Sequence, residues 1–210
     1  ISVGISGNYA IVGAYLEQGQ VGKAYVFNVT TGALLYTFNH PRTASYARFG
    51  GKVIVSDNYA VVATETNSSS SSSVLNYVFV YNLVAGNPIA ELELPNDQDP
   101  TIAISDGRLI IGIKDVAVGG LTQAGQVKIF DIDGLTVTPT DISSPTFTLN
   151  NPNDFGTSDG DNFGYSVAMD GNYAIVSAYG EDDAGGTSSG KAYLYKTTNG
   201  EWTDTTLLNT

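Results

Sequence analysis

The chain has 210 residues, 9 of them basic and 21 acidic, which gives a net charge of -12 and a strongly acidic surface. This charge argues against nucleic acid and anionic membrane surfaces as partners, because both would repel the chain. The sequence contains no cysteine for disulfides or thiolate metal sites, and no apolar run approaches the roughly 20 residues of a membrane span.

Four copies of one unit follow each other along the chain, within a single region, 1–210. Two anchors recur in step in every copy, which makes chance similarity a poor explanation. The first anchor is "NYA", with Tyr9, Tyr59 and Tyr173, and with Leu109 in the corresponding place. The second is an apolar run that ends at Phe27, Tyr81, Phe130 and Tyr195. The approximate repeats are 1–41, 42–96, 97–152 and 153–210.

Each copy is expected to form four short strands. The first alternates ("KVIVS", "YSVAM"), the second is nearly continuous apolar ("YAVVAT", "LIIGI"), the third is aromatic and β-branched, and the fourth is half polar. Between the first two strands stand Gly, Asn and Asp, which tolerate the positive φ of tight hairpins. These turns are Ser6–Asn8, Ser56–Asn58, Asp106–Arg108 and Asp170–Asn172.

An antiparallel unit of four strands that repeats about every 50 residues is typical of a β-propeller blade. The fold class predicted here is therefore all-β, with about four propeller blades in this chain, either alone or as part of a larger propeller. A β-sandwich is the competitor, but it gives no reason for self-similarity at this period. Helical periodicity is absent, so no helix is expected.

At Phe163-Gly164, followed by "YSVAMDGNYAIVSAYGEDDAGGTSSGKAYLY", the sequence resembles the FG-GAP repeat family. The second copy keeps the pair as Phe49-Gly50, whereas the third has lost it. The resemblance implies the β-propeller of integrin α-subunits and of many bacterial and viral surface proteins. It therefore implies an extracellular place on a cell or virion surface, while function remains poorly specified by fold.

The resemblance suggests calcium as a possible cofactor. Integrin-type blades carry a calcium loop between the first two strands, but the turns here are too short to supply six to eight oxygens. Two acidic clusters elsewhere are the candidate calcium ligands, at the join before the fourth copy and in the loop after its second strand. Solvated turn charges are the alternative. The candidates are Asp159, Asp161, Glu181, Asp182 and Asp183.

Three tyrosines near predicted loop ends are the candidate binding residues, because aromatic rings are enriched in protein and carbohydrate contacts. They are Tyr15, Tyr46 and Tyr179. The tyrosines of the "NYA" anchor repeat at one structural position, so we expect them to pack between blades.

Catalysis is not expected. The only histidine, His40, stands in "NHPR" at a blade junction, where a surface or loop-capping role is the natural interpretation. Without an imidazole in a site, a nucleophile lacks its usual base. Paired carboxylates need a partly apolar pocket to act as acid and base.

Aligned with the fourth copy, Ile1 stands opposite Tyr165, just after the position of the missing Phe-Gly pair. We therefore expect the natural polypeptide to continue upstream, or the exposed blade edges to drive self-association. The function predicted is a non-enzymatic extracellular binding or adhesion module that presents loops to a protein or glycan on another surface. The alternatives are a structural repeat of a fibre, surface layer or virion appendage, and a lectin-like accessory domain of a carbohydrate-active enzyme.

Overall fold

The computed structural model divides the chain into two compact units. The first unit comprises Ile1–Gln98 and Ile132–Ser143, and the second comprises Asp99–Asp131 and Ser144–Thr210. The organisation as one propeller region stays a prediction. The structure describes residues 1–42, 47–65, 75–94, 98–135, 140–153, 159–182, 186–198 and 201–208, and at 140 and 203–208 it describes the backbone alone.

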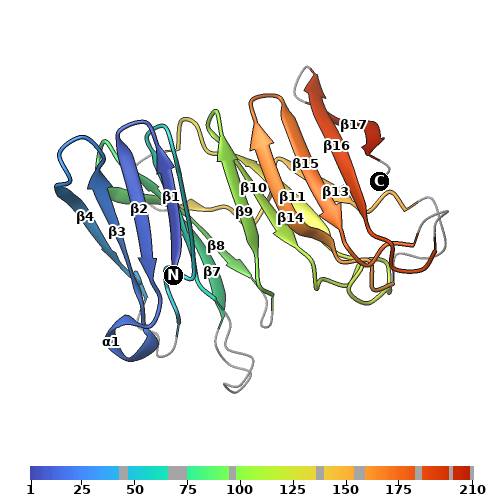
Figure 1. Cartoon of the computed structure of the whole chain (residues 1–210), viewed down its shortest axis with the longest axis horizontal. Coiled ribbons are helices and arrows are strands. Elements are labelled where there is room, and N and C mark those ends of the chain that lie inside the picture. The colour runs from blue at the N-terminus through green and yellow to red at the C-terminus, as the bar shows by residue number, and fades with distance from the viewer. Residues whose placement is uncertain are drawn as a thin grey trace. The chain divides into compact units, whose positions relative to one another are not determined.

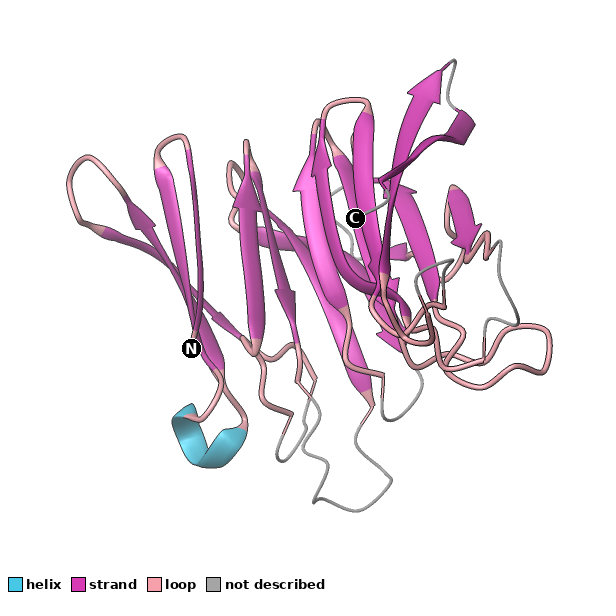
Figure 2. Ribbon diagram, turned by 45° about the vertical axis from the view of Figure 1, so that its right-hand side comes forward, coloured by secondary structure: helices cyan, strands magenta, loops and turns pink. Residues whose placement is uncertain are grey.

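The first unit opens with a four-stranded antiparallel sheet, blade 1, in which each strand pairs with the next along the chain. Its strands are β1 (Ser2–Ser6), β2 (Tyr9–Ala14), β3 (Lys23–Asn28) and β4 (Leu34–Asn39). A four-residue helical segment, α1 (Glu17–Gln20), lies between β2 and β3 (Figures 1 and 2). No helix was expected from the sequence. Periodicity could not show one this short, in which Gln18 and Gly19 have left-handed φ values.

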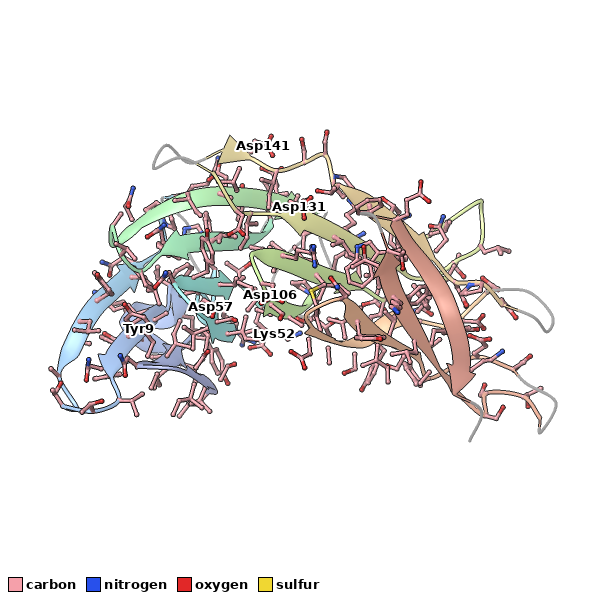
Figure 3. The ribbon with its side chains drawn as sticks, turned by 90° about the horizontal axis from the view of Figure 1, so that it is seen from above. Tyr9, Lys52, Asp57, Asp106, Asp131 and Asp141 are labelled. Carbon is pink, nitrogen blue, oxygen red and sulfur yellow. The ribbon has the colours of Figure 1, made fainter. Side chains whose placement is uncertain are left out.

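Blade 2 completes the first unit and carries an unexpected fifth strand. Its antiparallel strands are β5 (Lys52–Ser56), β6 (Tyr59–Ala63), β7 (Asn76–Asn82) and β8 (Asn87–Leu94). The fifth, β12 (Thr140–Asp141), pairs with β8 in parallel, so a segment assigned to the third repeat adds to the second blade. The N–H of Ile142 also donates to the carbonyl of Glu91 at 2.9 Å. Asp141 is labelled in Figure 3.

The second unit holds blades 3 and 4, both four-stranded and antiparallel. The fold class is thus confirmed as all-β with blade-like sheets. Blade 3 consists of β9 (Thr101–Ser105), β10 (Arg108–Ile113), β11 (Gln126–Asp131) and β13 (Phe147–Asn150). Blade 4 consists of β14 (Phe163–Asp170), β15 (Tyr173–Ala178), β16 (Lys191–Thr198) and β17 (Glu201–Leu208).

All four predicted hairpins between first and second strands are present, each with two turn residues. The first turn residue has a positive φ, as at Gly7 (52°) and Asp57 (51°). One alignment was wrong: Ser105 pairs with Arg108, so Arg108 starts β10, and it rather than Leu109 occupies the place of the "NYA" tyrosines. Tyr9 and Asp57, at neighbouring hairpins of the first unit, are labelled in Figure 3.

Each unit has an apolar core between its two blades. In the first unit, side chains such as Ile11 and Val26 of blade 1 pack against Val62 and Phe79 of blade 2. In the second, Ile110 and Ile129 of blade 3 belong to one cluster with Val176 and Tyr193 of blade 4. Successive side chains of a strand point to opposite faces of its sheet, so the contact within each unit buries one face of each of its two blades.

The "NYA" tyrosines do not share one environment. Tyr9 packs against the core of the first unit as expected, whereas Tyr173 is 47% exposed. The Tyr59 hydroxyl donates to Asp133 at 2.9 Å, in the segment that leads to β12. In the described part of the chain, no helix is both long and apolar enough to cross a membrane.

Candidate functional site

The Phe-Gly pair joins blade 1 to blade 2 through close backbone contact. Phe49 is fully buried and donates its N–H to the carbonyl of Val21 at 2.9 Å, and it forms a parallel bridge with Gly22. A Cβ added at Gly22 would lie 2.1 Å from the carbonyl oxygen of Phe49, and one at Gly13 would lie 2.0 Å from that of Gly50. Only glycines allow the two blades to approach this closely.

The same joint recurs in the second unit. Phe163, also fully buried, donates its N–H to Ala124 at 3.1 Å and bridges Gly125. A Cβ at Gly125 would lie 2.0 Å from the carbonyl oxygen of Phe163. The left-handed residues match as well: Gln20, Gly22, Arg48 and Gly50 in the first unit, and Gln123, Gly125, Asn162 and Gly164 in the second.

Two of the predicted acidic residues are buried beside the second joint. Asp161 is 2% exposed, and its Oδ2 accepts hydrogen bonds from the side-chain amides of Asn151 (2.7 Å) and Asn153 (2.9 Å). Glu181 is fully buried, accepts a hydrogen bond from the Tyr193 hydroxyl and lies 3.6 Å from the ammonium of Lys191. The two asparagines were not predicted as site residues, because neither is acidic or part of a repeat anchor.

Burial governs the electrostatics of both carboxyls. It is the largest cause that raises the pKa of Asp161 to about 6, and the negative charge of Glu181 adds to the effect. Burial likewise raises the pKa of Glu181, against the opposing influence of the Tyr193 hydroxyl and the Lys191 ammonium. The charges of Asp161 and Glu181 therefore act on each other within the blade joint. A backbone hydrogen bond from the N–H of Gly180 to the carbonyl of Asp161 (3.1 Å) joins the loop before Phe163 to the loop after β15.

The other acidic candidates lie nearer to solvent. Oδ1 of the exposed Asp159 accepts hydrogen bonds from the N–H (2.8 Å) and hydroxyl (2.7 Å) of Thr122, which ties the join before blade 4 to a loop of blade 3. Oδ1 of Asp182 accepts the N–H of Ser188 at 2.6 Å. Asp183 is outside the described residues. Among those described, no three His, Cys, Asp or Glu side chains form a group that could hold a metal ion. Calcium binding stays a prediction.

The candidate tyrosines have different surroundings. Tyr179 is 56% exposed and makes an edge-to-face contact with Tyr165, itself 47% exposed, at a centroid distance of 4.5 Å. Tyr15 is half-buried beneath the guanidinium of Arg48, 5.7 Å from the ring centre. Tyr46 lies outside the described residues. Tyr165 was not among the predicted binding residues, although its position directly after the Phe-Gly pair could have identified it.

His40 is not the surface residue that was expected. It is 9% exposed, and its ring meets those of Phe49, Tyr77 and Phe79 edge-on. The loop-capping interpretation is supported by the contact of Nδ1 with the backbone of Arg42, 2.8 Å from its carbonyl oxygen. Burial lowers the pKa of the imidazole, so the neutral ring serves packing.

Comparison with known proteins finds a family match for part of the chain and a structural similarity for most of it. The family model described as FG-GAP repeat matches residues 155–195. No curated protein matches the chain. The structure is similar to that of the computationally designed Ika8 protein, with a TM-score of 0.55 and 16% identity, over 96% of this chain and 46% of Ika8. It is also similar to the designed Ika4 protein, with a TM-score of 0.51 and 17% identity, over 94% of this chain and 90% of Ika4. The chain thus spans less than half the length of Ika8, and at these identities the likeness concerns the fold alone.

Proposed function

Because residues 155–195 form an FG-GAP repeat and both units consist of propeller-type blades, we propose that the chain is a non-enzymatic binding and adhesion module of an extracellular surface. Its blades supply rigid sheets, and the loops at their ends supply the contacts with a protein or glycan. FG-GAP repeats are often found in adhesion-related propellers, which supports this role by analogy.

The observation that carries the proposal is the exposed pair of Tyr165 and Tyr179. Two aromatic rings that contact each other at 4.5 Å and remain about half exposed form a preorganised apolar platform. Tyr165 stands on blade 4 directly after Gly164, whose backbone is held against Gly112, and Tyr179 directly follows β15. Rings on a fixed backbone lose little conformational entropy on binding, so they suit the flat faces of sugar rings or the side chains of a protein partner.

The charge of the module restricts that partner. Asp159 and Asp182 lie on loops of the same unit, and the whole chain has a net charge of -12. Anionic ligands would be repelled, whereas neutral glycans and neutral or basic protein surfaces would not. A non-enzymatic role is supported by the burial of the sole imidazole, His40, among aromatic rings.

The test is binding of the purified chain to arrays of neutral glycans and of extracellular matrix proteins. Replacing both Tyr165 and Tyr179 with Ala is expected to weaken binding at least about tenfold, since aromatic anchors dominate such contacts. The matched double Phe variant keeps both rings and is expected to stay within about threefold of the wild type. Unchanged binding by the double Ala variant would contradict the proposal.

An enzymatic role has its own test on the glycans that bind. Hydrolysis that disappears when Asp182 and Asp183 are replaced with Asn would show that the module is catalytic. We expect no turnover by the wild type, because Asp182 Oδ1 already accepts an exposed hydrogen bond from the N–H of Ser188, whereas a carboxyl that acts as acid or base needs a partly apolar pocket.

A further inference from the structure

The contact between the two blades of each unit has two chemically distinct sides. We call the side given by the earlier blade its trailing face and the side given by the later blade its leading face. In the first unit the trailing face of blade 1 includes Ile11, Ala24 and Val26, and the leading face of blade 2 consists of Val53, Val55, Ala60, Val62, Phe79 and Tyr81. In the second unit, the strand registers identify the corresponding trailing face of blade 3 as Ile110, Val127 and Ile129. They identify the corresponding leading face of blade 4 as Val167, Met169, Ala174, Val176, Tyr193 and Tyr195.

Blade 1 also has a leading face, and it is uncovered. The same registers identify its six residues as Val3, Ile5, Ala10, Val12, Tyr25 and Phe27. All six are apolar or aromatic, like their buried counterparts in blades 2 and 4. Val3 is 68% exposed and Ile5 is 70% exposed, whereas the corresponding Val53 and Val55 are 6% and 4% exposed. This face has the composition of a blade contact without a blade on it.

Blade 4 has an uncovered trailing face. Its residues Ile175, Ala192 and Leu194 correspond in register to Ile11, Ala24 and Val26 of blade 1. Ile175 and Leu194 are only half-buried, and together with Tyr173 they line an open hollow of about 180 Å³. By contrast, Ile11 and Val26 are fully buried against blade 2.

We propose that these two faces bind each other between copies of the chain, so that the trailing face of blade 4 in one copy packs on the leading face of blade 1 in a second copy. The contact would repeat the one that each unit already makes between its own blades. None of the nine residues is charged. The charged side chains beside the blade 4 face are Asp170, which lines the same hollow, and Lys196, whose ammonium lies 5.6 Å from the ring centre of Tyr173. The two uncovered faces are apolar and correspond, residue for residue, to the two sides of the blade contact inside each unit. Burial of such exposed apolar surface is favourable.

The contact is heterologous, because each copy uses a different face for its two neighbours. This property separates it from a symmetric contact between two blade 1 faces. It also goes beyond the proposed binding role, which rests on Tyr165 of β14 and on Tyr179.

The test is the mass of the 210-residue chain in solution, measured by light scattering after size exclusion. We expect a species of at least twice the 22.0 kDa of one chain. A charge on either face, as in Ile5→Glu or Ile175→Glu, is expected to weaken association at least about 100-fold, since it would be buried unpaired. Circular dichroism checks folding, and Tyr173→Glu, at a 47% exposed site on the edge of the blade 4 face, is the milder alternative to Ile175→Glu. Val84→Glu, at a 72% exposed site outside both faces, is the matched control and should associate like the wild type.

Mixing the two variants gives the decisive result. The Ile5→Glu copy keeps an intact blade 4 face and the Ile175→Glu copy keeps an intact blade 1 face, so the mixture should form a heterodimer although neither variant self-associates. A wild type that stays at 22.0 kDa across micromolar concentrations would overturn the proposal. Failure of two folded variants to combine, or self-association by the Ile175→Glu copy alone, would overturn it equally.

Discussion

The carbonyl oxygen of Phe49 occupies the space that a Cβ on Gly22 would need, only 2.1 Å away. The relationship is repeated between Phe163 and Gly125 at 2.0 Å. In both units the Phe-Gly segment is therefore held against a glycine of the preceding blade. Four left-handed residues per joint and the buried phenylalanine ring fix this arrangement, and the tyrosine pair at 165 and 179 stands directly on it.

Alanine at either joint glycine should be strongly destabilising. Gly22→Ala and Gly125→Ala each combine a backbone clash with φ values of 86° and 80°, and we expect each to lower the free energy of unfolding by at least about 3 kcal/mol. Gly32→Ala is the control, with a φ of 70° but nothing within 4 Å of the added Cβ, and it should cost about 1–2 kcal/mol. Urea denaturation measures the difference in the free energy of unfolding. If the joint variants and Gly32→Ala lose equal stability, the backbone clash does not contribute.

Truncation of the buried phenylalanine should leave a cavity in the joint. Phe163 is fully buried against Tyr193 and Tyr195, so Phe163→Ala is expected to cost about 3–5 kcal/mol. Val84→Ala, on an exposed turn, should change stability by no more than about 0.5 kcal/mol. Thermal unfolding of the two variants decides this, and a Phe163→Ala protein as stable as the Val84→Ala control would be incompatible with the joint.

Lowering the pH should remove a destabilising effect of the buried Asp161 carboxylate. The pKa of this carboxyl is raised in the folded state from 3.8 to about 6, so the folded protein binds the proton more readily than the unfolded chain. The resulting destabilisation is fully present above pH 6 and disappears as the pH falls towards 3.8. Asp161→Asn should therefore stabilise the protein by about 1–2 kcal/mol at pH 7, where each pKa unit is worth about 1.4 kcal/mol and weaker bonds from the asparagines offset part of the gain.

Denaturation of wild type and Asp161→Asn at pH 7 and pH 4.5 tests this sign. The stability gain of the variant should shrink on going to pH 4.5. A gain that is constant with pH, or a loss at pH 7, would mean that the carboxyl is not held at a raised pKa.

His40 should change the pH dependence of stability in the direction opposite to Asp161. Burial lowers its pKa in the folded state below the ordinary 6.5, so the unfolded chain takes up the proton first and stability falls as the pH drops through 6.5. His40→Phe keeps an aromatic ring among Phe49, Tyr77 and Phe79 but cannot titrate. Between pH 7 and pH 5 the variant should lose less stability than the wild type. Identical slopes would show that the imidazole is accessible in the folded protein.

Local patterns allowed the strands and turns to be predicted from the sequence. Alternation and turn residues were sufficient for the four blades, because strand formation and two-residue hairpins depend on neighbours in the chain. Arg108 was misplaced by one position since "SDGR" contains three plausible turn residues, and only the pairing of Ser105 with Arg108 resolves them. The addition of Thr140 and Asp141 to β8 could not be predicted, because a two-residue parallel strand has no sequence pattern of its own.

The site was predicted less completely than the fold. The acidic residues before Phe163 and after β15 were predicted as candidate calcium ligands, and in the structure the negative charge of Glu181 contributes to the raised pKa of Asp161. Their partners Asn151 and Asn153 come from the join after β13, and only the folded chain brings them to Asp161. Exposure likewise depends on packing, which is why Tyr173 was expected in a core and Tyr165 was overlooked.

The most direct test of the central claim is hydrogen exchange at the amides of Phe49 and Phe163. These donate to the carbonyls of Val21 and Ala124 inside the blade joints, outside the regular ladder of either sheet. They should exchange as slowly as amides of β3 and β16, at least about 1,000-fold more slowly than the amide of Thr31 in an exposed turn. Exchange as fast as that of Thr31 would contradict the account, because the Phe-Gly segment would then not be held against the preceding blade.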